Sequence, residues 1–174
     1  IVRPSIIFGS EDNFFNQFAN MARFSPVLPL IGGGTTRFQP VFVGDVADAL
    51  ATLIDRGAAP SKVYELGGPE VISFKDLMAY VLATVQRKRV LLPLPWALAN
   101  SIASITGLLP KPVLTSDQVD LLRSDNVVST EAEAEKRTLA GLDIRTNSFR
   151  TVVPSYLYRY RAAGQFTAPS SMPE

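Results

Sequence analysis

Residues 30–50, LIGGGTTRFQPVFVGDVADAL, combine three adjacent glycines with an arginine, residue types that can bind phosphate groups. A dinucleotide-binding turn needs the spacing G-x-G-x-x-G directly between a strand and a helix, and a Walker loop needs a closing Gly-Lys-Ser/Thr. Gly32, Gly33 and Gly34 are instead adjacent, and a second apolar segment, residues 38–43, separates them from the next helical pattern. The spacing therefore favours a flexible turn between two extended segments over a phosphate-binding loop.

Arg37 and two aspartates follow these glycines. A guanidinium at a loop edge suits bidentate binding of a phosphate, although a solvated arginine, or one paired with a neighbouring part of the fold, explains Arg37 equally well. Asp45 and Asp48 stand at the start of a helical pattern. Capping of the helix N-terminus by Asp45, together with the helix dipole, accounts for this pair better than acid–base chemistry does.

Missing residue types narrow the chemistry further. The 174-residue chain has no cysteine and no histidine, which excludes disulfides, thiol nucleophiles and imidazole catalysis from these residues. No metal site is expected. Lysine plus arginine number 17 against 16 acidic residues, so the charge gives no indication of nucleic-acid binding. No apolar run approaches the roughly 18 residues that a transmembrane helix needs.

Hydrophobic periodicity predicts alternating strands and helices, which is typical of an α/β protein. Strands are expected at residues 1–8, 27–31, 38–43, 63–66 and 90–94, and helices at 13–24, 45–56, 74–86, 96–106, 115–123, 131–141 and 151–163. Ser73 and Thr115 are expected to cap two of these helices, and Gly57 is expected to take the left-handed conformation after the helix at 45–56. Up to residue 66 the pattern resembles the end of a doubly wound sheet, and from 67 to 165 helices dominate. The tail, 166–174, has no periodicity and is expected to be disordered.

The first residues, IVRPSIIFG, read as a buried strand entered partway along, with no initiator methionine. We therefore expect the chain to be part of a longer protein. Such a part would leave an open sheet edge that favours aggregation or pairing.

Three stretches resemble the extended short-chain dehydrogenases, the NAD-dependent epimerase/dehydratase family: RPSIIFG at 3–9, LIGGGTTRFQPVFVGDVADAL at 30–50 and VYELGGPEVISFKDLM at 63–78. The resemblance implies the C-terminal end of a Rossmann-like NAD(P)-binding domain, followed by a small α+β domain for a substrate or partner. It also implies a preceding half with a glycine loop and a Y-x-x-x-K pair, which would bind most of the NAD or NADP. This sequence has neither, so no catalytic residue is expected in it, and by itself it should be inactive.

The same resemblance implies site residues. Arg3, Pro4 and Ser5 match the strand end that lines the nicotinamide side of the cofactor, although a plain strand end with a structural arginine is the alternative. Arg37, with Gly33 and Gly34, matches the side where family members bind a small-molecule nucleotide substrate.

A narrower resemblance rests on RPSIIFGSEDNFFNQFA, TRFQPVFV and LTSDQVDLLRSDNVVS, of which SDNV at 124–127 is the most particular part. These stretches are similar to the NAD(P)H-binding accessory subunits of respiratory complex I (NADH:quinone oxidoreductase) and their bacterial relatives. This implies a structural or assembly role, with other complex I subunits as partners. The expected location is the cytoplasm, or the cytoplasmic or matrix face of the respiratory membrane. The alternative is an active epimerase, dehydratase or reductase acting on a nucleotide sugar or similar substrate, with a homodimer partner.

Two surfaces leave the choice of partner open. SYLYRYRAAGQF at 155–166 interleaves tyrosines with arginines, which is typical of a helix that docks on its own fold, although a partner-protein interface is the alternative. The apolar helix expected at 96–106 is a core element by default. It is also the best candidate for peripheral contact with a membrane-embedded assembly.

Overall fold

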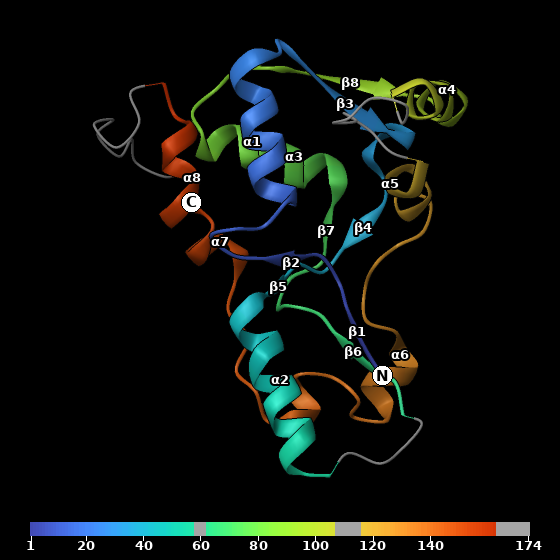
Figure 1. Cartoon of the computed structure of the whole chain (residues 1–174), viewed down its shortest axis with the longest axis vertical. Helices are drawn as coiled ribbons and strands as arrows, with labels where there is room; N and C mark the ends of the chain where they lie inside the picture. Colours follow the sequence, from blue (N-terminus) through green and yellow to red (C-terminus); the bar gives the residue numbers. More distant parts are fainter. Residues whose placement is uncertain (58–61, 107–115, 163–174) are drawn as a thin grey trace.

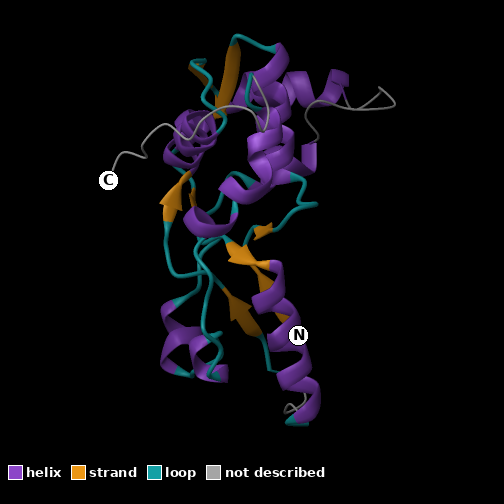
Figure 2. Ribbon diagram, turned by 90° about the vertical axis from the view of Figure 1, so that its left-hand side faces the viewer, coloured by secondary structure: helices purple, strands orange, loops and turns teal. Residues whose placement is uncertain are grey.

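The computed structural model describes residues 1–57, 62–106 and 116–162. The molecule is elongated, with α1 (Phe14–Phe24) and α3 (Phe74–Thr84) at one end and α2 (Val43–Asp55) at the other (Figure 1). The strands at residues 2–8, 41–42 and 64–66 lie between these two ends, whereas those at 27–31 and 90–94 lie at the end that holds α1 and α3 (Figure 1 and Figure 2).

Residues 1–8 form two short strands where one was predicted. β1 (Val2–Pro4) runs parallel to β6 (Tyr64–Leu66), and β2 (Ile7–Phe8) runs parallel to β5 (Val41–Phe42). The break falls where the chain changes partners: the Ser5 N–H donates to the Leu66 carbonyl, and the Ile6 carbonyl accepts from the Val41 N–H.

The expected strand at 38–43 is divided as well, into β4 (Arg37–Phe38) and β5. Pro40 lies between them and has no N–H to donate to a ladder. β4 pairs antiparallel with β7 (Ile72–Ser73).

A third parallel pair confirms two predicted strands at their predicted bounds. β3 (Val27–Ile31) pairs with β8 (Val90–Leu94), so that Leu28 lies opposite Leu91. The triple glycine follows β3 as a 3₁₀ turn, η1 (Gly32–Gly34), and all three glycines have positive φ.

The helices α1 and α3 confirm the predicted amphipathic segments. Ser73 caps α3 as predicted, because its Oγ accepts from the Asp76 N–H at 3.1 Å. The start of α1 is held by Asp12, whose Oδ1 accepts from the Phe15 N–H at 2.6 Å.

The prediction that Asp45 is the N-cap of the next helix is wrong. α2 begins at Val43 with Phe42 at the cap position, so Asp45 lies within the first turn. Its buried carboxylate accepts from the backbone N–H and side-chain amide of Asn147, at 2.8 and 2.6 Å. Asp45 therefore binds Asn147, far along the chain, instead of capping its own helix. Gly57 adopts the left-handed conformation expected after this helix, with φ of 60°.

The helix α4 (Trp96–Thr106) has its predicted bounds, whereas the helices after it are shorter than their patterns predicted. These are α5 (Ser116–Leu121), α6 (Thr130–Ala134), η2 (Ala140–Leu142), α7 (Phe149–Val152), α8 (Pro154–Leu157) and η3 (Tyr158–Tyr160). The single helix expected at 151–163 is wrong, because Pro154 lacks the N–H that a continuous helix requires and begins a new turn. The predicted cap at Thr115 and the tail 166–174 lie outside the described residues.

The docking interpretation of the tyrosine- and arginine-rich segment holds for the residues described. The Tyr156 hydroxyl donates to Asp12 at 2.5 Å, and Arg159 donates to the Asn16 side chain at 2.6 Å. Farther along, Arg161 donates to the Thr84 carbonyl. The segment therefore packs across α1 and the end of α3.

Two hydrophobic cores organise the fold. The larger core contains the buried faces of α1, α3, β3 and β8 together with Phe149 and Leu157. The smaller core joins α2 and β6 to Leu139 and Leu142. Each core draws on residues from both sides of residue 66, and the division into residues 1–66 and 67–165 stays a prediction.

Candidate functional site

The carboxyl ends of β1 and β6 define the candidate site. Parallel pairing places Pro4 opposite Leu66, so Ser5 and Gly67 leave the ladder at the same edge. Open α/β sheets bind ligands at this edge. Arg3, Pro4 and Ser5, the predicted cofactor contacts, therefore lie where a ligand would be expected.

Residues 125–129 cross this edge and are tied to it by hydrogen bonds. The buried Ser5 hydroxyl donates to the Asn126 carbonyl at 2.6 Å and accepts from the Gln39 N–H at 3.1 Å. The Gln39 side chain links two further segments, because its amide donates to the Gly68 carbonyl and its carbonyl accepts from the Val128 N–H. The polar groups of Ser5 and Gln39 are thus already engaged within the protein.

Arg37 is held by the same crossing segment. Both Nε and an Nη of its guanidinium lie 2.8 Å from Oδ2 of Asp125, and its backbone N–H donates to Oδ1 at 2.8 Å. The side chain of Arg37 is 61% exposed. The Asp125 carboxylate is therefore the anionic partner of Arg37 in this structure.

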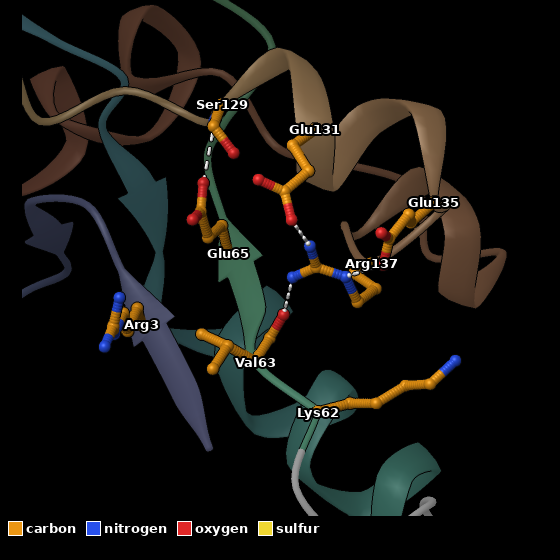
Figure 3. A pocket seen from close by; sticks show the side chains of 8 residues that line it. All are labelled: Arg3, Lys62, Val63, Glu65, Ser129, Glu131, Glu135 and Arg137. Atoms are coloured by element: carbon orange, nitrogen blue, oxygen red, sulfur yellow. Dashed lines mark hydrogen bonds and ion pairs between the residues drawn. The ribbon is translucent and has the colours of Figure 1, made fainter.

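A cavity of about 240 Å³ lies between Arg3, Pro4 and Ser5 on one side and residues 125–129 on the other. A second cavity, of about 380 Å³, adjoins it and is lined by charged side chains. Figure 3 shows Arg137 in the middle of this second cavity, where it donates to the Val63 carbonyl and to Glu131. Arg137 also pairs with Glu135 at 2.6 Å. These contacts tie the segment after α6 to β6.

Hydrogen bonds lower the pKa of two carboxyl groups at this edge. The Ser129 N–H, 2.8 Å from Glu65, is the largest influence and holds the pKa of Glu65 below its usual value. The backbone N–H of Arg37, followed by its side chain, does the same for the pKa of Asp125. Glu135 raises the pKa of Arg137. All these groups are charged at neutral pH.

The structure thus brings Arg3, Pro4, Ser5 and Arg37 together around residues 125–129, whereas Gly33 and Gly34 line neither polar cavity. A β-carbon on Gly32 would lie 2.1 Å from the Trp96 ring, and one on Gly34 would lie 3.0 Å from Lys75. Close packing and positive φ explain these two glycines without a ligand.

Sequence reasoning did not identify Gln39, Glu65, Asp125 and Arg137 as parts of this site. Asp125 lies 88 positions from Arg37, and no local spacing links them. The only signal was SDNV itself, which stood out as a family feature and not as a contact.

The cavity at this edge is too small for a whole dinucleotide. Pro4 and Ser5 line a cavity of about 240 Å³, below the 300–1,000 Å³ typical of small-molecule sites. A whole NAD or NADP would therefore need walls beyond these. Among residues 1–57, 62–106 and 116–162, no group of three or more His, Cys, Asp or Glu side chains is placed to hold a metal ion. No helix in the same part of the chain is long and apolar enough to cross a membrane.

Comparison with known sequences gives a consistent set of relatives, although no family model matches the chain. The chain is 33% identical over 174 residues to NADH dehydrogenase [ubiquinone] 1 alpha subcomplex subunit 9, mitochondrial, of Arabidopsis thaliana, covering 94% of the chain and 42% of that protein. The Rattus norvegicus subunit of the same name is 35% identical over 133 residues, covering 75% and 35%. The 40 kDa subunit of Neurospora crassa NADH-ubiquinone oxidoreductase is 25% identical over 170 residues, covering 97% and 43%. The chain spans less than half the length of these relatives.

Solved structures show the fold. DesIV, a dTDP-glucose 4,6-dehydratase from Streptomyces venezuelae with NAD bound, superposes with a TM-score of 0.60 at 16% identity, covering 92% of the chain and 42% of DesIV. The UDP-glucose 4-epimerase of Thermus thermophilus, also with NAD, gives 0.57 at 16% identity, covering 93% and 46%. The predicted α/β fold of the epimerase/dehydratase type is confirmed. By sequence, the chain is a homologue of the alpha subcomplex subunit 9 of NADH dehydrogenases, and by fold it belongs with the short-chain-dehydrogenase-like epimerases and dehydratases.

Proposed function

We propose that the chain is part of an NAD(P)H-binding accessory subunit of respiratory complex I, with a structural or assembly role. One observation carries the proposal: the similarity to alpha subcomplex subunit 9 extends over 94% of the chain at 33% identity. Relatives from a plant and a mammal carry this name, and a fungal relative is the 40 kDa subunit of NADH-ubiquinone oxidoreductase. Other complex I subunits are the proposed partners.

The geometry at Arg37 favours this role over the alternative, catalysis on a nucleotide sugar. Asp125 already binds the Nε and one Nη of Arg37 through Oδ2, and its Oδ1 accepts from the backbone N–H of Arg37. A substrate phosphate would have to displace the Asp125 carboxylate. Because Asp125 belongs to the same chain as Arg37, this pair forms without the loss of translational freedom that a free substrate would incur.

The cofactor proposal is NAD or NADP held mainly outside these 174 residues. Arg3, Pro4 and Ser5 would contribute one wall at the carboxyl end of β1, beside the 125–129 segment. In such a role the nucleotide would stabilise the subunit, because any ligand that binds only the folded state adds to its stability.

Peripheral contact with the respiratory membrane is proposed for the β8 region. Val90, Leu92 and Leu98 are 62%, 53% and 51% exposed, and Lys88 and Arg89 precede them. Apolar side chains flanked by cations suit the interface of an anionic membrane. The relatives are mitochondrial proteins, and the proposed location is the matrix or cytoplasmic face of the respiratory membrane.

Assembly with complex I can be tested in the organism that encodes the protein. A tagged full-length protein should migrate with NADH dehydrogenase activity on native gels of solubilised membranes, and deletion of its gene should lower the amount of assembled enzyme. A tagged protein found only at low mass, with complex I unchanged in the deletion, would overturn the proposal.

Cofactor binding and catalysis need separate measurements. Purified full-length protein, denatured and analysed by chromatography, should release NAD(H) or NADP(H). Incubation with UDP-glucose or dTDP-glucose should give no product. Turnover of either sugar nucleotide would favour the enzymatic alternative instead.

A further inference from the structure

An apolar cavity of about 300 Å³ lies against the larger core and borders the polar edge, because Asn126 lines both this cavity and the 240 Å³ one. Four phenyl rings, those of Phe14, Phe18, Phe38 and Phe74, contribute to its wall, and their centroids lie 5.0–6.3 Å apart in mainly edge-to-face contacts. Helix α1, strands β3, β4 and β8, and helix α5 supply further walls. Figure 1 shows where these elements lie in the fold.

The chemistry of the wall selects against charge. Every described residue that lines this cavity is uncharged, and nearly all are apolar or aromatic. Burying a phosphate or carboxylate among them would carry a large desolvation cost with no cation to offset it. Nucleotide sugars are ligands of enzymes that share this fold, but the uncharged wall of this cavity does not suit them.

Two amide side chains provide the polar contacts that the wall offers. Gln17 projects from α1, and Asn126 lies in the crossing segment. The hydrogen bonds described for both residues involve their backbone groups, so within the described structure the amides are available to a ligand. A primary amide can donate to a carbonyl or accept from a hydroxyl.

The size sets the scale of the ligand. One water molecule takes up about 30 Å³ in the liquid, and we take the same volume for each heavy atom of a ligand. On that basis the cavity of about 300 Å³ holds roughly ten heavy atoms. Small-molecule sites are commonly apolar clefts of this size or larger, with few polar groups. The cavity is partly open to solvent, since Leu121 in its wall is 69% exposed, so a ligand could enter it from that side.

We propose that this cavity binds an uncharged, mainly hydrocarbon molecule or chain of about ten heavy atoms with one hydroxyl or carbonyl group. The hydrocarbon contacts the phenyl rings, and the polar group meets Gln17 or Asn126. The inference does not depend on the role in complex I, because it rests on the walls of the cavity alone.

Binding can be measured on full-length protein with three probes: 1-nonanol, nonanoate and UDP-glucose. Displacement of the neutral dye Nile red, below the aggregation concentration of each probe, should show 1-nonanol binding at least about tenfold more tightly than nonanoate, as a desolvated charge requires. UDP-glucose should not displace the dye. Equal affinity for alcohol and carboxylate, or no binding of the alcohol, would overturn the proposal.

A filling variant locates the site. Met21→Trp adds bulk from α1 into the cavity and should weaken 1-nonanol binding by more than about tenfold. Leu50→Trp, on the exposed face of α2, is the matched control and should leave binding unchanged. Gln17→Leu should weaken the alcohol but not n-butylbenzene, which has no hydrogen-bonding group. If both tryptophan variants bind the alcohol like wild type, the ligand lies elsewhere and the proposal is wrong.

Photolabelling gives a second measurement that does not depend on the folding of variants. A diazirine analogue of 1-nonanol should label peptides that contain residues 14–21 or 119–126 of the wild-type protein. Labelling confined to other peptides would overturn the proposal. If another part of the protein fills the cavity, neither dye nor alcohol will bind and Met21→Trp will lower the melting temperature, which also contradicts it.

Discussion

The two cores of this molecule are held together by different kinds of contact. The larger core packs rings and aliphatic side chains against one another, including the fully buried Phe15, Phe74 and Phe149. The smaller core around α2 depends on polar ties from distant segments, such as Asp45 to Asn147 and Arg137 to Val63. Apolar packing tolerates changes of pH, whereas charged ties respond to it. The candidate site lies on the polar side, so conditions that alter charge should affect it first.

The largest effect is expected from opening the larger core. Phe74→Ala removes a fully buried ring that contacts Phe14, Phe18 and Phe38, and should lower the free energy of unfolding by about 3–5 kcal/mol. Urea denaturation measures the change. Phe24→Ala, at a position 77% exposed, is the control and should cost little. A small cost at Phe74 would mean that the aromatic cluster does not carry the stability of this end.

The polar tie of the smaller core comes next. Asp45→Ala leaves the backbone N–H and side-chain amide of Asn147 without their acceptor and should cost about 2–3 kcal/mol. Asp48→Ala, three residues along on the exposed side of α2, should change stability by less than about 0.5 kcal/mol. Equal effects at the two positions would show that the bonds from Asn147 to Asp45 add little to stability.

The glycine turn beside the larger core should show a graded response. Gly33→Ala places a side chain in open space but at φ of 75°, and should cost about 1–2 kcal/mol from backbone strain alone. Gly32→Ala adds a collision with Trp96 to similar strain, so it should cost more. Thermal unfolding of both variants separates the cost of backbone strain from the cost of the collision with Trp96. Equal costs at the two positions would show that Trp96 moves aside, and a larger cost at Gly33 would contradict the prediction.

The smallest effect is expected at the polar edge, and it depends on pH. The folded pKa values of Glu65 and Asp125 are lowered, so the stability they add is present above the ordinary carboxyl pKa, about 4, and is lost as pH falls through the folded values. Asp125→Asn should cost at most about 1 kcal/mol at neutral pH, since Arg37 is well exposed. The double variant with Glu65→Gln should show a shallower loss of stability between about pH 5 and 3 than wild type.

The control for this pH dependence is Asp55→Asn, at an exposed position on α2. Its acid unfolding curve should match that of wild type. A double variant as acid-sensitive as wild type would show that other carboxyl groups control the low-pH transition.

Local patterns predicted much of the secondary structure. The bounds of β3 and β8, the cap at Ser73 and the left-handed Gly57 followed from periodicity and backbone preference, which act within a few residues. Predictions failed where a distant contact intervened. Residues 1–8 are divided because Ser5 bonds to Leu66 and Ile6 to Val41, and Asp45 turns to Asn147 instead of capping its helix.

The candidate site was predicted only in part. Resemblance picked out Arg3, Pro4, Ser5 and Arg37, which the fold brings to one edge, and also Gly33 and Gly34, which line neither polar cavity there. Their roles in binding stay predictions. Residues such as Gln39 and Asp125 could not be found from spacing, since the partners that define them lie up to 89 positions away.

By itself, the sequence determined the alternation of strands and helices, the family relationship and the absence of histidine and cysteine chemistry, because each is written in residue types or short-range order. Only the tertiary structure decided that Asp125 neutralises Arg37, that Ser5 and Gln39 are engaged by the crossing segment, and that four phenylalanines surround an uncharged cavity. The physical reason is the same in each case. Hydrogen bonds, ion pairs and cavity walls depend on distances between segments far apart in the chain, and those distances exist only once the chain has folded.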